Sequence, residues 1–130
     1  MSLISQLKTL ATRVGTEIKG LVRPDNPGLA QAWVSFGYVG GTIVISASHN
    51  VSGVTRLAAG RYRITFATPF VDANYCWVAF ARSTANSGTA RTAIARSTSD
   101  AKTATHVEII CATGSTSLAD TTEMNLVVYR

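Results

Sequence analysis

The chain has 130 residues, of which 46% are hydrophobic and 15% are charged, and its 12 Lys and Arg exceed its 7 Asp and Glu to give a net charge of +5. This length and apolar content predict one globular unit with its own core and exclude a disordered chain, while the low share of charge suggests that other subunits cover part of the surface. The basic residues are scattered along the sequence instead of forming a stripe with interleaved aromatic side chains, which argues against a nucleic-acid-binding protein.

The first predicted element is an amphipathic helix at the N-terminus, with Ser2 as its N-cap and Gly20 as its C-cap. Its apolar residues recur every three or four positions, as expected for one narrow stripe along an α-helix. The stripe consists of Leu3, Leu7, Leu10, Val14, Ile18 and Leu21. Because residues 1–21 are amphipathic and no run reaches the ~20 apolar residues of a membrane span, we expect neither a signal peptide nor membrane insertion.

A helix with one apolar stripe needs a surface against which to bury it. Two surfaces are open to it: the β-domain of its own chain, or copies of the same helix. We favour a bundle of copies, because a linker containing Pro and Gly (residues 22–31) separates the helix from the strands.

Eight strands are predicted after the linker, each bounded by turn residues. They cover residues 32–36, 42–48, 50–57, 61–67, 74–82, 89–97, 104–112 and 122–129. Many short strands without a second helix predict an antiparallel sandwich or barrel, of which we favour the sandwich, and Gly53 inside the third strand is expected to mark a bulge. The chain is therefore divided into a helix and linker (1–28) and a mainly β, sandwich-like head (29–130).

Both cysteines lie within apolar strand segments. We expect Cys76 and Cys111 to be small buried side chains of a protein assembled in a reducing cytosol, with a disulfide between neighbouring strands as the alternative. The later strands are rich in Ala, Ser and Thr, as in residues 90–96, and such small side chains suggest close approach to a neighbouring sheet. In an oligomer that sheet can belong to another subunit.

No catalytic or metal-binding constellation stands out in the sequence. The two histidines, His49 and His106, are far apart, and the histidines and cysteines lack the close pairing of a zinc site. Asp72 and Asp120, which could form the carboxylate pair of a glycosidase, are expected at opposite ends of the strands. We therefore expect a protein that is not an enzyme and that holds no metal and no cofactor.

Four short motifs follow one another in the chain. They are Ala32-Trp33-Val34-Ser35-Phe36, residues 46–55 (SASHNVSGVT), residues 60–66 (GRYRITF) and Asp72-Ala73-Asn74-Tyr75. In this order and spacing they resemble the distal domain of tail-fibre proteins of tailed bacteriophages, which typically show A-W-V-x-F, N-V-S-S-V-T, G-x-Y-x-x-x-F and D-A-N-Y. The resemblance covers residues 32–80 and extends loosely to the helix. Gly53 stands where that family usually has serine, and the glycine-repeat shaft of many fibres is absent, so the protein would be a stub instead of a long rod.

The resemblance implies a homotrimeric virion protein that is assembled in the host cytoplasm. Three helices would form a parallel bundle at the particle end and dock on another virion protein at the tail, the tail tip or the head surface. Three β-domains would bind a glycan or lipopolysaccharide of the host surface, with no nucleic acid among the partners. The alternative is a structural fibre or adaptor that decorates the head or tail without binding a receptor.

If successive strands alternate in direction, the connections 37–41, 58–60, 83–89 and 113–121 lie together at the end away from the helix. Tyrosine offers a stacking face for a sugar ring, and hydroxyl and amide groups offer hydrogen bonds. The predicted receptor-binding residues are Tyr38, Thr84, Asn86, Ser87, Ser115, Thr116 and Asp120. The competing interpretation is that these residues are ordinary hydrophilic turn residues.

Overall fold

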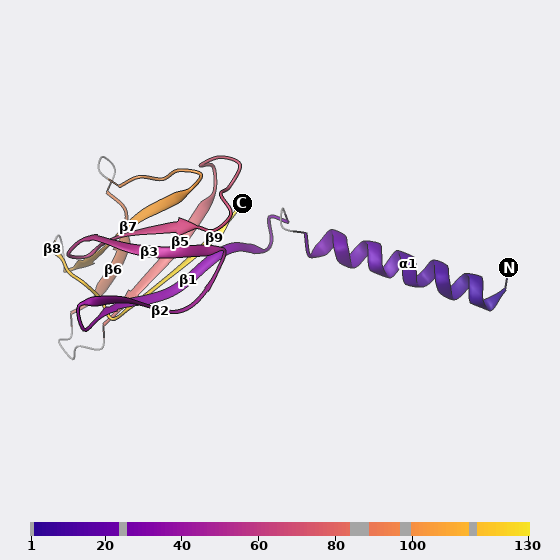
Figure 1. The fold of residues 1–130 in the computed structure, drawn as a ribbon, viewed down its shortest axis with the longest axis horizontal. Coiled ribbons are helices and arrows are strands. Elements are labelled where there is room, and N and C mark those ends of the chain that lie inside the picture. The colour runs from indigo at the N-terminus through magenta and orange to yellow at the C-terminus, as the bar shows by residue number, and fades with distance from the viewer. Residues whose placement is uncertain (1, 24–25, 84–88, 97–99, 115–116) are drawn as a thin grey trace.

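The chain begins with a long helix that projects from one end of a β-sandwich (Figure 1). The computed structural model describes residues 2–23, 26–83, 89–96, 100–114 and 117–130. Helix α1 (Leu3–Leu21) is capped as predicted by Ser2, whose hydroxyl accepts from the backbone N–H of Ser5. Gly20 is not its C-cap. The helix continues through Gly20, and the N–H of Val22 closes the last turn on the carbonyl of Ile18 at 3.0 Å.

The sandwich consists of two antiparallel sheets. Sheet A contains, in spatial order, β2 (Thr42–His49), β1 (Ala30–Val39), β9 (Glu123–Tyr129) and β5 (Cys76–Arg82). Sheet B contains β3 (Val51–Ala58), β4 (Arg61–Phe66), β7 (His106–Thr113) and β6 (Arg91–Ile94), and the short β8 (Ser117–Leu118) also pairs with β7. The predicted mainly β, sandwich-like fold is thus confirmed.

The core lies between the sheets and is built from alternate residues of the strands. In β4 and β9 every second side chain is buried, as expected for strands with one face on a core. Phe36 of sheet A and Tyr62 of sheet B meet edge to face, with ring centroids 5.2 Å apart. The fully buried side chains include Val34, Phe36, Tyr62, Ile64, Val107, Ile109, Met124, Leu126 and Val128.

Each of the eight predicted strands has a counterpart in the structure, with ends shifted by a few residues. The largest differences are in β1, which covers Ala30–Val39 where residues 32–36 were predicted, and in β6, which covers Arg91–Ile94 where residues 89–97 were predicted. Strand β8 was not predicted, because two residues show no periodicity. The bulge predicted at Gly53 is confirmed by a register shift between Val51 and Gly53 in the pairing of β3 with β4.

The cysteines differ from each other. Cys111 is buried as predicted, whereas Cys76 is exposed, and neither forms a disulfide. Cys76 shares a face of β5 with exposed Val78 and Phe80, because side chains alternate along a strand, and this face points away from the core. An apolar sequence around a cysteine therefore did not imply burial here.

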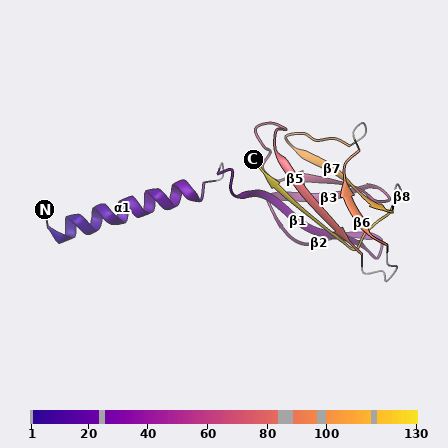
Figure 2. The same ribbon diagram turned by 180° about the vertical axis from the view of Figure 1, so that it is seen from behind.

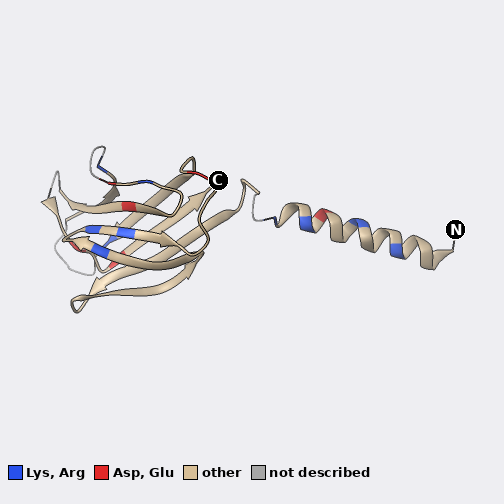
Figure 3. Cartoon of the chain, turned by 45° about the horizontal axis from the view of Figure 1, so that its top comes forward, with Lys and Arg blue, Asp and Glu red and all other residues tan. Residues whose placement is uncertain are grey.

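The sandwich has two distinct ends. The linker enters at one end, where the C-terminus also lies (Figures 1 and 2), and we call the opposite one the far end. The turns between β1 and β2 and between β3 and β4 are at the far end, as alternation of the strands predicted. Charge is unequally distributed, because β1 and β2 contain no Lys, Arg, Asp or Glu, whereas β3, β4 and β7 contain several (Figure 3). No helix in the described residues has the length and apolarity needed to cross a lipid bilayer.

Candidate functional site

The far end is the predicted receptor-binding site, and the structure describes two of its predicted residues. Tyr38 lies near the end of β1, and Asp120 precedes β9. The remaining predicted residues lie outside the described residues and keep their status as predictions: Thr84, Asn86, Ser87, Ser115 and Thr116.

Tyr38 and Asp120 are brought together by Arg56 of β3. The Arg56 guanidinium donates two hydrogen bonds to the Asp120 carboxylate, from Nε to Oδ1 at 3.0 Å and from Nη2 to Oδ2 at 2.7 Å. Its Cζ also lies 4.5 Å from the centroid of the Tyr38 ring, which is a cation–π contact. One face of the ring that was predicted to stack on a sugar is therefore occupied by an arginine.

Asp120 accepts further hydrogen bonds from within the chain. The N–H of Gly60 and the hydroxyl of Tyr62 both donate to Oδ1, at 2.9 and 2.8 Å. The bond from Arg56, together with those from Gly60 and Tyr62, lowers the pKa of Asp120 to about 2 although partial burial opposes the shift. Burial and the same carboxylate raise the pKa of Tyr62. The charged Asp120 side chain thus connects the two sheets through hydrogen bonds, and it is also a candidate binding residue.

The turn that supplies the Gly60 N–H requires glycine. Gly60 has a φ of 65°, and a Cβ at this position would lie 2.6 Å from the backbone nitrogen of Ala119. The far end is therefore held in one geometry by backbone as well as side-chain contacts. Sequence reasoning missed Arg56 because an arginine in an alternating strand resembles a solvated charge, and nothing local connects it to a residue 64 positions later.

The second candidate site is the apolar stripe of α1. No residue of this helix is buried, and the exposed fraction of the predicted stripe residues runs from 46% at Val14 to 69% at Leu3. Ile4, which the periodicity did not select, is exposed beside them. The stripe does not pack on the sandwich of its own chain, so the first of the two alternatives for it is wrong.

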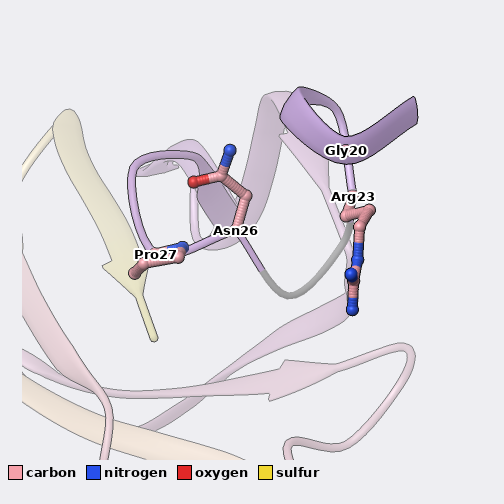
Figure 4. Close-up of a pocket in the computed structure, with 4 residues that line it drawn as sticks. All are labelled: Gly20, Arg23, Asn26 and Pro27. Atoms are coloured by element: carbon pink, nitrogen blue, oxygen red, sulfur yellow. The ribbon is translucent and has the colours of Figure 1, made fainter. Parts of the chain in front are cut away.

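Asn26 makes two hydrogen bonds at the junction between α1 and β1. Its Nδ2 donates to the carbonyl of Leu21 at 2.5 Å, and its Oδ1 accepts from the N–H of Gly28 at 2.9 Å. A hollow of about 330 Å³ at this junction is lined by Gly20, Arg23, Asn26 and Pro27 (Figure 4). It is open and polar, unlike the enclosed apolar pockets that bind small molecules, so these contacts are better understood as fixing the exit of the chain from α1.

The residues considered for chemistry are separated in space or engaged in ion pairs. Asp72 pairs with Arg130 beyond the end of β9, whereas Asp120 precedes its start, so these two carboxylates are at opposite ends as predicted. The Glu108 carboxylate accepts from Arg63 and from the N–H of Ala101. In the described part of the chain, no group of three or more His, Cys, Asp or Glu is placed to hold a metal ion.

The comparisons with known proteins add no relative. No family model matches the sequence, and neither curated proteins nor solved structures give a significant match.

Proposed function

We propose that this chain is a short tail-fibre-like virion protein of a tailed bacteriophage, which acts as a homotrimer and attaches the particle to a host-surface glycan or other receptor. The observation that carries the proposal is the apolar stripe of α1, exposed along the whole length of a helix that projects from the sandwich. The ordered motifs of residues 32–75 point to the same class of protein.

The stripe supports oligomerisation on energetic grounds. An isolated 19-residue helix is marginal in water, and its exposed Leu, Val and Ile side chains gain free energy only when another surface covers them. Copies of the same helix supply a matching stripe in register. A bundle also places three sandwiches at the same end, with their far ends directed away from the particle.

The far end supports attachment through its geometry. Arg56 and Tyr38 form a fixed, partly exposed pair of a guanidinium and an aromatic ring, which suits polar ligands. Each site of this kind binds weakly, and three copies in one trimer convert weak contacts into firm attachment. No enzymatic step is part of the proposal.

A second candidate function is a structural fibre or adaptor that decorates the head or tail. The specific observation in its favour is that Asp120 is engaged by Arg56, Gly60 and Tyr62, which leaves this predicted binding residue less free for a receptor.

An adsorption assay separates the two functions. Purified full-length protein is added to host cells before particles that carry the same protein. An attachment protein binds the cells and reduces particle adsorption in a dose-dependent way, whereas a decorating fibre does neither. Under both functions, particles assembled with a chain lacking residues 1–28 should lose the protein, and its retention would contradict the role of the helix as the anchor.

A further inference from the structure

The outer face of sheet A is rich in large apolar side chains, and no other described segment of the chain covers it. The strand register places Trp33, Val127 and Val78 side by side across β1, β9 and β5. Phe80 lies two residues further along β5 on the same face, and this residue is 70% exposed. A row of large apolar side chains across neighbouring strands is typical of an interaction surface and not of a solvated sheet face.

This face is also nearly free of charge. Strands β1 and β2 contain no Lys, Arg, Asp or Glu, and β5 and β9 contribute only Arg82 and Glu123 (Figure 3). These two residues are cross-strand neighbours and form an ion pair with each other at 2.5 Å. The charge within the face is therefore already neutralised, which lowers the cost of removing it from water.

Sheet B differs, because the chain itself covers the outer face of its strand β7. All residues of β7 from Val107 to Ala112 are buried, so both faces of this strand are covered. Asp100, whose side chain is 1% exposed, pairs with Arg96 and Arg61. Arg61 lies opposite Ile110 in the register, which places this ion cluster over the outer face of β7. The chain thus covers this part of sheet B and leaves the outer face of sheet A open.

We propose that the outer face of sheet A packs against the other copies of this chain, so that the three sandwiches turn sheet A toward the common axis of the trimer. This inference rests on the proposed trimer and identifies its second contact surface. The argument for copies as the occupant is the connection to α1: residues 22–29 lead from the helix directly into β1 of sheet A, and Asn26 ties this linker to the helix end. A bundle of helices would hold the sandwiches within one linker length of each other, at an effective concentration in the millimolar range.

The chemistry of the face fits a copy better than a glycan. Trp33, Val78, Phe80 and Val127 offer apolar area, and the backbone groups between them are paired within the sheet. Two polar side chains lie between them, Ser35 and Asn125, and the amide of Asn125 already donates a hydrogen bond within β9. A second copy of the face covers the large apolar side chains, whereas a glycan needs several hydrogen-bond partners and would leave most of that apolar area exposed.

A cysteine on the outer face of sheet A can report whether that face is covered. Cys76 lies on it, two positions before Val78 and opposite Tyr129, and is exposed in the single chain. Cys111 is buried in the core, where burial raises the pKa of its thiol. Thiol labelling therefore reports on the outer face of sheet A, with Cys111 as an internal control for unfolding.

The test compares the full chain with the double variant Leu10→Glu, Val14→Glu, by labelling with a maleimide under native conditions. These substitutions disrupt the stripe of a helix with no buried residue, so the sandwich stays folded. We expect Cys76 of the full chain to react at least tenfold more slowly than Cys76 of the double variant, with Cys111 unreactive in both. Light scattering on the same samples gives the mass of each.

A matched pair of variants tests the face itself. Val78 and Ile94 are 48% and 44% exposed, on the outer faces of sheet A and sheet B. Val78→Glu is expected to restore rapid labelling of Cys76, because three carboxylates would be desolvated at the axis, while Ile94→Glu keeps the protection. A neighbouring carboxylate by itself slows the reaction of a thiol with a maleimide. Val78→Glu is therefore also introduced into the double variant, and the labelling rate of Cys76 in that protein serves as the reference.

The outcomes separate this inference from the proposed function. A full chain with the mass of a trimer, whose Cys76 reacts as fast as in a double variant with the mass of a monomer, overturns the sheet A contact and leaves the helical trimer standing. A full chain with the mass of a monomer overturns both. Protection of Cys76 that persists unchanged with Val78→Glu, or in a double variant with the mass of a monomer, also overturns the contact, because some other part of the chain or another partner then covers the face.

Discussion

Asp120 joins the two sheets at the far end of the sandwich. It precedes β9 of sheet A, whereas its partners Arg56, Gly60 and Tyr62 belong to β3, β4 and the turn between them in sheet B. A single carboxylate thereby fixes the start of a central strand against the neighbouring sheet. Asp120 also holds the Arg56 guanidinium over the Tyr38 ring. The stability of the sandwich and the geometry of the candidate site therefore both depend on Asp120.

The pKa of Asp120 makes this contribution dependent on pH. The carboxyl group titrates at about 2 in the folded protein and near 3.8 when unfolded, so the folded state binds the proton more weakly. Its stabilisation is complete above about pH 5 and is lost as the pH falls through 2, amounting to about 2 kcal/mol. Asp120→Asn should lower the free energy of unfolding by about this amount at pH 7 and remove this part of the acid dependence, as measured by urea unfolding between pH 7 and pH 2.

Asp72→Asn is the matched control. Asp72 also forms an ion pair with an arginine, Arg130, but its side chain is 38% exposed against 22% for Asp120. An ion pair of that exposure contributes less than about 1 kcal/mol. An equal loss of stability in the two variants would show that the bonds from Gly60 and Tyr62 do not distinguish Asp120.

At the scale of elements, α1 is the least supported part of the structure. It has no buried residue, and Gly15 lies in its interior, where a Cβ would meet no atom within 4 Å in the single chain. Gly15→Ala should therefore favour the helix by about 1 kcal/mol per chain and raise its melting temperature, followed by circular dichroism at 222 nm.

Gly20→Ala serves as the comparison for Gly15→Ala. A Cβ at Gly20 also meets no atom within 4 Å, but this residue lies in the last turn, where fraying reduces the gain. If Gly15→Ala instead lowers the helix content or the mass of the assembly, then neighbouring helices approach closely at Gly15, and the stripe would have to include this residue.

The elements were predictable where periodicity is strong. In α1 the apolar residues recur every three or four positions, and this spacing correctly predicted the helix and its apolar stripe. In β4 apolar and polar residues alternate, and this correctly predicted the strand and its buried face. In β5 the side chains on both faces are apolar, and the pattern could not reveal that Cys76, Val78 and Phe80 point outward. The contacts of Arg56 with Tyr38 and Asp120 at the far end were not predictable either. They depend on how β3 lies relative to the start of β9.

At the scale of the whole molecule, the structure is polarised in two directions. Along its length, an amphipathic helix with an exposed apolar stripe lies at one end and the Arg56–Tyr38–Asp120 cluster at the other. Across its thickness, sheet B is covered over β7 by its own ion cluster, whereas sheet A presents a bare apolar face. Both apolar surfaces belong to segments connected by the short linker, so association through one brings the other into reach.

The proposed attachment depends on the number of chains that are joined. The full-length protein and the double variant Leu10→Glu, Val14→Glu have the same far end, but only the first has an intact stripe. If attachment uses three weak sites together, the full-length protein should inhibit particle adsorption at a concentration of chains about a hundredfold lower than the double variant. The matched variant Thr9→Glu, Thr16→Glu adds the same charges away from the stripe and should retain the potency of the full-length protein. Equal potency of the two proteins would mean that a single chain binds the receptor fully, and inhibition by neither would favour the decorating fibre.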